Sequence, residues 1–147
     1  IACLNVKTKQ LIKRLPPFTL TAIVTAAVLY LTLVPKPLPD NDIEWFEGAD
    51  KVVHAIMMLG ITGSLGLDYM RRYGKRELQA PALLIIVFVL ATGVFGGLIE
   101  VIQGWMDLGR GEDIQDFIAD CVGALAGGFL SLVLWQPVHR WFWGKHK

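Results

Sequence analysis

The sequence predicts an all-α integral membrane bundle of four transmembrane helices, with the amino and carboxyl termini in the cytoplasm. Of the 147 residues, 54% are hydrophobic and 18% are charged, against about 45–50% and 25% in an average soluble domain. The apolar residues gather in four long blocks, more than the single core of such a small domain can shelter from water. The basic residues fall mainly in alternate loops, which indicates how the helices cross the membrane.

A membrane-spanning helix needs about 20 mostly apolar residues. The first block, 18–34, carries no charge and has prolines on both sides, which favour helix ends there. The second block, 52–70, is weaker because it contains His54, several glycines and Asp68. Both segments lack the polar–apolar alternation of membrane β-strands, so we expect helices.

The third and fourth blocks are more apolar but carry acidic residues at one end. Segment 81–102 is apolar until Glu100, close to its end. Segment 114–135 has Asp116 and Asp120 in its first two turns. The acidic residues of the two helices therefore face the same side of the membrane.

The basic residues set the orientation, because they are retained on the cytoplasmic side. Eleven of the 14 lie before the first block, between the second and third, or after the fourth. We therefore expect a cytoplasmic N-terminal segment (1–17), a transmembrane domain (18–135) and a cytoplasmic tail rich in basic and aromatic residues (136–147). The net charge of only +1 argues against a nucleic-acid partner.

This topology brings polar residues of three segments to one depth on the outer face. Asp50 and His54 are four residues apart and share a helix face, as do Glu100 and Gln103 at three apart. Ionisable residues at the centre of a membrane cost about 2.5–3.5 kcal/mol each and usually face the bundle interior or a wet cavity. The candidate pocket residues are Asp50, Lys51, His54, Glu100, Gln103, Arg110, Asp116 and Asp120.

Small residues continue the polar face of the fourth segment. Beyond Asp116 and Asp120, the same stripe carries Gly123, Gly127 and Ser131. Small residues four apart let two helices approach closely. We expect glycine-lined packing seams whose outer ends open into the polar pocket.

Two structural interpretations compete with a functional pocket. In the first, Lys51 and Arg110 neutralise nearby carboxylates and lock the bundle together. A histidine beside an aspartate is more often an oriented hydrogen-bonding group than a catalyst. Against these, several carboxylates face few cations, so some carboxyl groups are protonated, reach water or bind a cationic ligand.

Metal and nucleophile chemistries have little support. Carboxylates of Asp50, Glu100, Asp116 and Asp120 suit a hard divalent ion, but no recognised ligand spacing accompanies them, and we expect neither a metal nor a cofactor. Cys121 has no second thiol nearby. If the pocket is catalytic, His54 or Glu100 is the candidate general base.

Short motifs over residues 20–135 carry a family resemblance. The first pieces are Leu33-Val34-Pro35 and Asp50-Lys51-Val52-Val53-His54. The later pieces are Glu100-Val101-Ile102-Gln103, Arg110, Asp116, Asp120 and Gly123. In their order and their places relative to four spans they resemble the VanZ-like family. Asp120 stands where that family usually has asparagine.

The resemblance implies a protein of the bacterial inner membrane connected with resistance to teicoplanin-type glycopeptide antibiotics. Three hypotheses follow. The leading one is a pocket in the outer leaflet that binds or remodels a lipid, a lipid-linked cell-wall precursor or a lipophilic antibiotic, with Asp50 orienting His54. The second is a membrane enzyme acting on a lipid-linked substrate. The third is an accessory subunit whose glycine seams dock a membrane-protein partner or a second copy of the chain.

Overall fold

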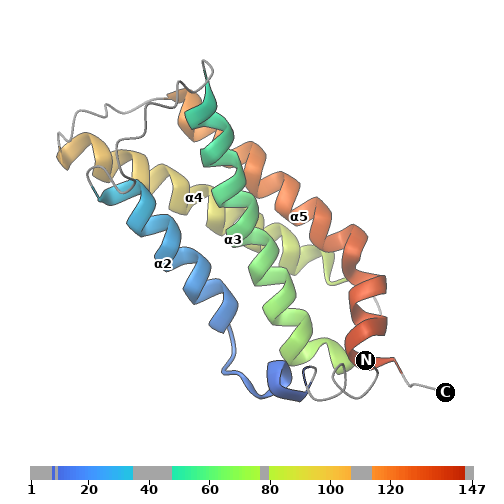
Figure 1. The fold of residues 1–147 in the computed structure, drawn as a ribbon. Helices are drawn as coiled ribbons and strands as arrows, with labels where there is room; N and C mark the ends of the chain where they lie inside the picture. Colours follow the sequence, from blue (N-terminus) through green and yellow to red (C-terminus); the bar gives the residue numbers. More distant parts are fainter. Residues whose placement is uncertain (1–7, 9, 35–47, 77–79, 107–113, 145–147) are drawn as a thin grey trace.

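The computed structural model describes residues 8, 10–34, 48–76, 80–106 and 114–144 (Figure 1). Within these ranges the chain is helical and has no strands. The elements are α2 (Thr19–Leu33), α3 (Ala49–Tyr73), the short 3-10 helix η1 (Gly74–Arg76), α4 (Ala82–Met106) and α5 (Ile114–Trp143). The predicted all-α class with four apolar helices is confirmed.

Three of these helices, α3, α4 and α5, are long and apolar enough to cross a membrane. Helix α2 is apolar but has 15 residues, about 22 Å of helix at 1.5 Å per residue, against a hydrocarbon layer of about 30 Å. The outward faces are apolar, with large side chains such as Leu83, Leu90 and Phe129 exposed. Four membrane spans were predicted, and three of the four helices are long and apolar enough to be such spans.

Three helices extend beyond the predicted segments, and α4 ends at Met106, about one turn beyond 81–102. Helix α3 begins at Ala49 and ends at Tyr73, about one turn more at each end than 52–70. Helix α5 passes Pro137 and ends at Trp143, although a proline inside a helix removes one backbone hydrogen bond. Tertiary contacts offset that loss, because the His139 ring bonds the Gly74 carbonyl at 2.8 Å.

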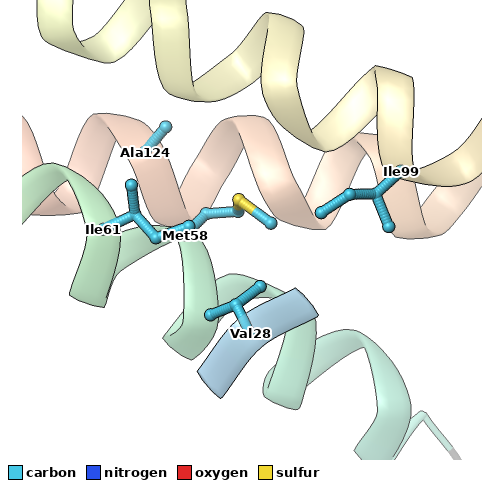
Figure 2. Packing of buried hydrophobic residues seen from close by; sticks show 5 residues of the cluster. All are labelled: Val28, Met58, Ile61, Ile99 and Ala124. Carbon is cyan, nitrogen blue, oxygen red and sulfur yellow. The ribbon is translucent and has the colours of Figure 1, made fainter. Parts of the chain in front are cut away.

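The apolar core is narrow and lies between all four helices. Figure 2 shows its five buried members, which come from α2 (Val28), α3 (Met58 and Ile61), α4 (Ile99) and α5 (Ala124). Their exposed fractions are 5% or less, whereas the surrounding outward faces remain apolar. The interior and the outward faces are thus similarly apolar. A lipid environment favours this, because moving an apolar side chain from lipid into the space between helices gains little free energy.

Helices α3 and α5 lie side by side (Figure 1) and approach closely along a glycine seam. A Cβ atom at Gly123 would collide with the backbone of Ala55. At Gly127 it would lie 2.7 Å from the Leu59 carbonyl oxygen and 2.9 Å from the Thr62 Cβ. The predicted seam is therefore confirmed, and its partner is α3 of the same chain.

A buried ion pair lies in the last two turns of α3 and joins this helix to the segment before α2 and to α2 itself. Arg71 and Asp68 are nearly inaccessible, and Nη2 of the guanidinium lies 2.9 Å from Asp68 Oδ1. The other carboxylate oxygen, Oδ2, accepts hydrogen bonds from the Thr21 backbone N–H and hydroxyl, both at 2.9 Å. The guanidinium also donates to the main-chain oxygens of Ile12, Leu15 and Pro16. We call this end, with its exposed basic residues, the basic end.

The segment before α2 also reaches the end of α5. Lys13 Nζ donates to the Phe142 carbonyl oxygen at 2.7 Å and lies 4.0 Å above the Trp143 ring. The Trp143 indole N–H in turn donates to the Met70 carbonyl oxygen at 3.2 Å. The sequence did not predict these contacts of Arg71 and Trp143, because it places Arg71 in a loop and Trp143 in the tail.

The glycine seam generates a matched pair of variants. Gly123→Ala should lower the free energy of unfolding by about 1–3 kcal/mol, the usual cost of overpacking, because its Cβ meets the Ala55 backbone. Gly63 lies on α3 close to the same seam, but a Cβ atom there would have open space around it. Gly63→Ala should therefore leave the free energy of unfolding unchanged or raise it by up to about 1 kcal/mol. Unfolding in mixed detergent–SDS micelles, followed by circular dichroism, measures both. Equal stabilities for the two variants would contradict the close approach.

The ion pair generates a second comparison between two neighbouring arginines. Arg71→Met strands the buried Asp68 carboxylate and should lower the free energy of unfolding by about 3–5 kcal/mol. Arg72→Met removes an exposed side chain and should change it by no more than about 0.5 kcal/mol. The same micelle unfolding assay applies. A similar loss in both variants would show that positive charge in general, and not the Asp68 contact, stabilises this end.

Candidate functional site

The starts of α3 and α5 lie side by side at the end of the bundle opposite the basic end, and α4 runs toward that end as well (Figure 1). We call this end the polar end. The sequence brings three ionisable residues there because each lies within two turns of a helix terminus: His54 in α3, Glu100 in α4 and Asp120 in α5. Helices α3 and α5 run in the same direction and α4 runs antiparallel to both, which places the three side chains at one level.

These three side chains converge inside the bundle. His54 Nδ1 lies 3.2 Å from Asp120 Oδ1 and 3.6 Å from Glu100 Oε1. The three side chains are 9%, 0% and 8% exposed in the order His54, Asp120 and Glu100. Two carboxylates therefore face a single ring nitrogen in a nearly water-free position, and we refer to the three residues as the triad.

A more exposed ion pair lies one helical turn outside the triad. Lys51 Nζ is 3.3 Å from Asp116 Oδ1, which links α3 to α5. The same ammonium lies 3.3 Å from Asp50 Oδ2. Lys51 precedes His54 by three residues and Asp116 precedes Asp120 by four, so both lie on the triad's faces of their helices. Lys51 and Asp116 thus form a partly hydrated rim above the triad.

Asp50 does not orient His54, as the sequence suggested it would. Its side chain is 61% exposed and bonds Lys51, while the imidazole turns toward α4 and α5 and bonds Asp120. Asp50 lies in the first turn of α3, one full turn before the ring, and its side chain is directed to solvent and to Lys51. Asp120 therefore holds the position beside the ring that we expected for Asp50.

Gln103 has a structural contact. Its side-chain amide donates to the Thr32 carbonyl oxygen at 2.9 Å and so joins α4 to the last turn of α2. The Thr32 hydroxyl donates in turn to the Val28 carbonyl oxygen at 2.8 Å. Nothing in the sequence singled out Thr32, because it contributes a main-chain oxygen that every residue has.

Small residues make room for the triad. A Cβ atom at Gly96 would lie 2.6 Å from Asp120 Oδ2, so the carboxylate occupies the space that a side chain on α4 would fill. Gly123 lets α5 reach the Ala55 backbone, directly after His54. Asp120 Oδ2 is buried and has no hydrogen-bond partner among the described residues.

Of the eight predicted pocket residues, the structure thus joins His54, Glu100 and Asp120 and sets Lys51 and Asp116 beside them. Asp50 lies at the exposed edge and Gln103 ties two helices together. Arg110 lies outside the described residues. Chemically, the arrangement suits proton transfer, cation binding or the binding of a polar headgroup next to an apolar surface.

No family model, curated protein or solved structure matches this chain. The interpretation of the site therefore rests on its own geometry.

Proposed function

We propose that the chain is a multi-pass protein of the bacterial cytoplasmic membrane, in which α2, α3, α4 and α5 all cross the bilayer and both termini are cytoplasmic. The separation of charge supports this, since Arg72 and Lys75 are exposed at the basic end and the carboxylates gather at the polar end. Helix α2 is short, but bilayers adjust to short spans by local thinning at modest cost.

We propose further that the polar end is an outer-leaflet pocket that binds or remodels a lipid, a lipid-linked cell-wall precursor or a lipophilic glycopeptide antibiotic. One observation carries this: three buried ionisable residues from three helices meet below a partly exposed lysine. Burying charged groups is costly even when they are paired, and such residues in membrane helices are usually functional.

The chemistry of the rim fits a headgroup that carries phosphate or carboxylate. The Lys51 ammonium is partly exposed and reaches its partners at the long distance of 3.3 Å, so an anionic oxygen can compete for it. Below the rim, the triad offers acceptors for hydroxyl or amine groups. The apolar outer faces of the helices supply the surface for acyl or polyprenyl chains.

The resemblance to the VanZ-like family also supports a functional role for the polar end. The residues that carry it include Lys51, His54, Glu100, Asp116 and Asp120, which lie together at the polar end. A contribution to envelope stress tolerance or teicoplanin-type resistance is therefore part of the proposal.

A membrane enzyme acting on a lipid-linked substrate is the second candidate. The observation favouring it is the His54 ring nitrogen between two carboxylates, an arrangement that orients an imidazole as a general acid or base. The accessory-subunit hypothesis loses its main argument, because Gly123 and Gly127 pack against α3 of the same chain.

The orientation is tested with reporter fusions. Green fluorescent protein fused after residue 147 should fluoresce, because it folds in the cytoplasm. Alkaline phosphatase should be active when fused after residue 40 and inactive when fused after residue 76, because it requires the outer side of the membrane. The reverse pattern would refute the proposed orientation and with it the outer-leaflet location.

Ligand binding is tested by native mass spectrometry of the purified protein with added phosphatidylglycerol or polyprenyl phosphate. Lys51→Gln should weaken binding at least tenfold, since one charge-assisted contact to an anionic oxygen is worth about 1.5–3 kcal/mol and 1.4 kcal/mol is tenfold. Lys75→Gln, the same change at the basic end, should leave binding unchanged.

Equal binding by wild type and Lys51→Gln would exclude the rim as the headgroup site. The same samples distinguish the enzyme hypothesis. A change in mass of the added lipid that His54→Gln abolishes would favour catalysis, whereas unchanged lipid with retained binding would favour a binding protein.

A further inference from the structure

The triad brings together three side chains that can each act as a metal ligand. Two carboxylates, from Glu100 and Asp120, face the same nitrogen, His54 Nδ1. That nitrogen carries at most one proton, and one N–H directs its bond mainly at one acceptor. Asp120 Oδ1, at 3.2 Å, is the hydrogen-bonded partner, and Glu100 Oε1 lies 3.6 Å from the same nitrogen.

A second observation comes from the far side of the Asp120 carboxylate. Asp120 is fully buried, and its Oδ2 has no hydrogen-bond partner among the described residues. A buried carboxylate oxygen without a donor loses its hydration and receives nothing in return. A cation at the triad would offset that loss, because one carboxylate can ligate through either or both of its oxygens.

The spacing of the three groups fits a small divalent ion. His54, Glu100 and Asp120 each offer one ligand atom, and these atoms all lie within 4.8 Å of one another. Metal–ligand bonds of about 2.0–2.2 Å place neighbouring ligand atoms about 2.8–3.8 Å apart in octahedral, tetrahedral or trigonal geometry. The separations of 3.2 and 3.6 Å from His54 Nδ1 fall in that interval.

We propose that His54, Glu100 and Asp120 form a binding site for one divalent transition-metal ion, Zn²⁺ or Mn²⁺. An imidazole ligand favours these ions over Ca²⁺ and Mg²⁺, which take oxygen ligands. Two ionised carboxylates match the double positive charge, so the filled site is close to neutral in its buried position. Three protein ligands leave at least one coordination position for water or for an oxygen of a bound molecule.

This proposal departs from the expectation that the chain binds no metal, for which the carboxylates considered were those of Asp50, Glu100, Asp116 and Asp120. The structure separates these, because Asp50 is exposed and Asp116 bonds Lys51. The histidine, which comes from another helix, completes the set instead. The inference does not depend on the proposed lipid ligand, since an ion can fill the site with or without one.

The test uses the full chain in mild detergent, with any affinity tag removed, stripped with a chelator and titrated with ZnCl₂ or MnCl₂. We expect one ion per chain by elemental analysis of the dialysed protein. Asp120→Asn keeps the shape of the side chain but removes its charge, and it should weaken binding at least about tenfold, since even indirect partners of metal ligands contribute about 10–100-fold.

Asp116→Asn is the matched control, because it makes the same change one turn earlier on the same helix, and it should alter affinity by less than about threefold. Equal losses in the two variants would overturn the proposal and indicate diffuse attraction to an acidic surface. Wild-type protein that retains no ion after dialysis would also overturn it, leaving the triad as a hydrogen-bonded charge cluster.

X-ray absorption at the zinc edge of the wild-type protein provides a readout that needs no variant. We expect a shell of oxygen and nitrogen atoms with the scattering pattern of one imidazole. A sulfur neighbour would place the ion at a cysteine, and the absence of an imidazole would exclude His54; either result refutes the triad site even if Asp120→Asn fails to fold.

Discussion

Helices α3 and α5 approach each other closely because Gly123 has no side chain where it meets the backbone of Ala55. This approach brings His54, the residue before Ala55, to within 3.2 Å of Asp120, one turn before Gly123. Gly96 then leaves room on α4 for the Asp120 carboxylate. The close approaches at Gly96, Gly123 and Gly127 together fix the distances on which every chemical hypothesis for the polar end depends.

The two ends of the bundle handle buried charge in different ways. At the basic end, Arg71 and Asp68 satisfy each other and also bond Thr21 and main-chain oxygens, so both ions have nearly complete hydrogen bonding. At the polar end, two carboxylates share one imidazole, and Asp120 Oδ2 has no hydrogen-bond donor within the part of the chain that the structure describes. A fully bonded ion pair is typical of a structural contact, and an incompletely bonded set is typical of a site that receives something from outside.

The sequence was sufficient for the helices and for the level at which the polar residues lie, because hydrophobic length and helical spacing are local properties. It was insufficient for the pairing between helices. Asp50 and His54 share a helix face, yet the ring bonds Asp120, since packing against α5 outweighs proximity along α3. The role of Arg71 could not be predicted either, because its partners are chiefly main-chain oxygens, which every residue type has. Asp68, an acid inside an apolar segment, was the available signal.

Attachment through main-chain atoms has a consequence for how the N-terminal segment tolerates change. Arg71 binds the carbonyl oxygens of Ile12, Leu15 and Pro16, and Lys13 binds that of Phe142. Every amino acid offers such an oxygen, so replacement of a neighbouring side chain leaves the attachment points in place. Insertion or deletion of one residue would instead shift each oxygen away from the guanidinium. The constraint on this segment is thus on its length and path, and much less on its composition.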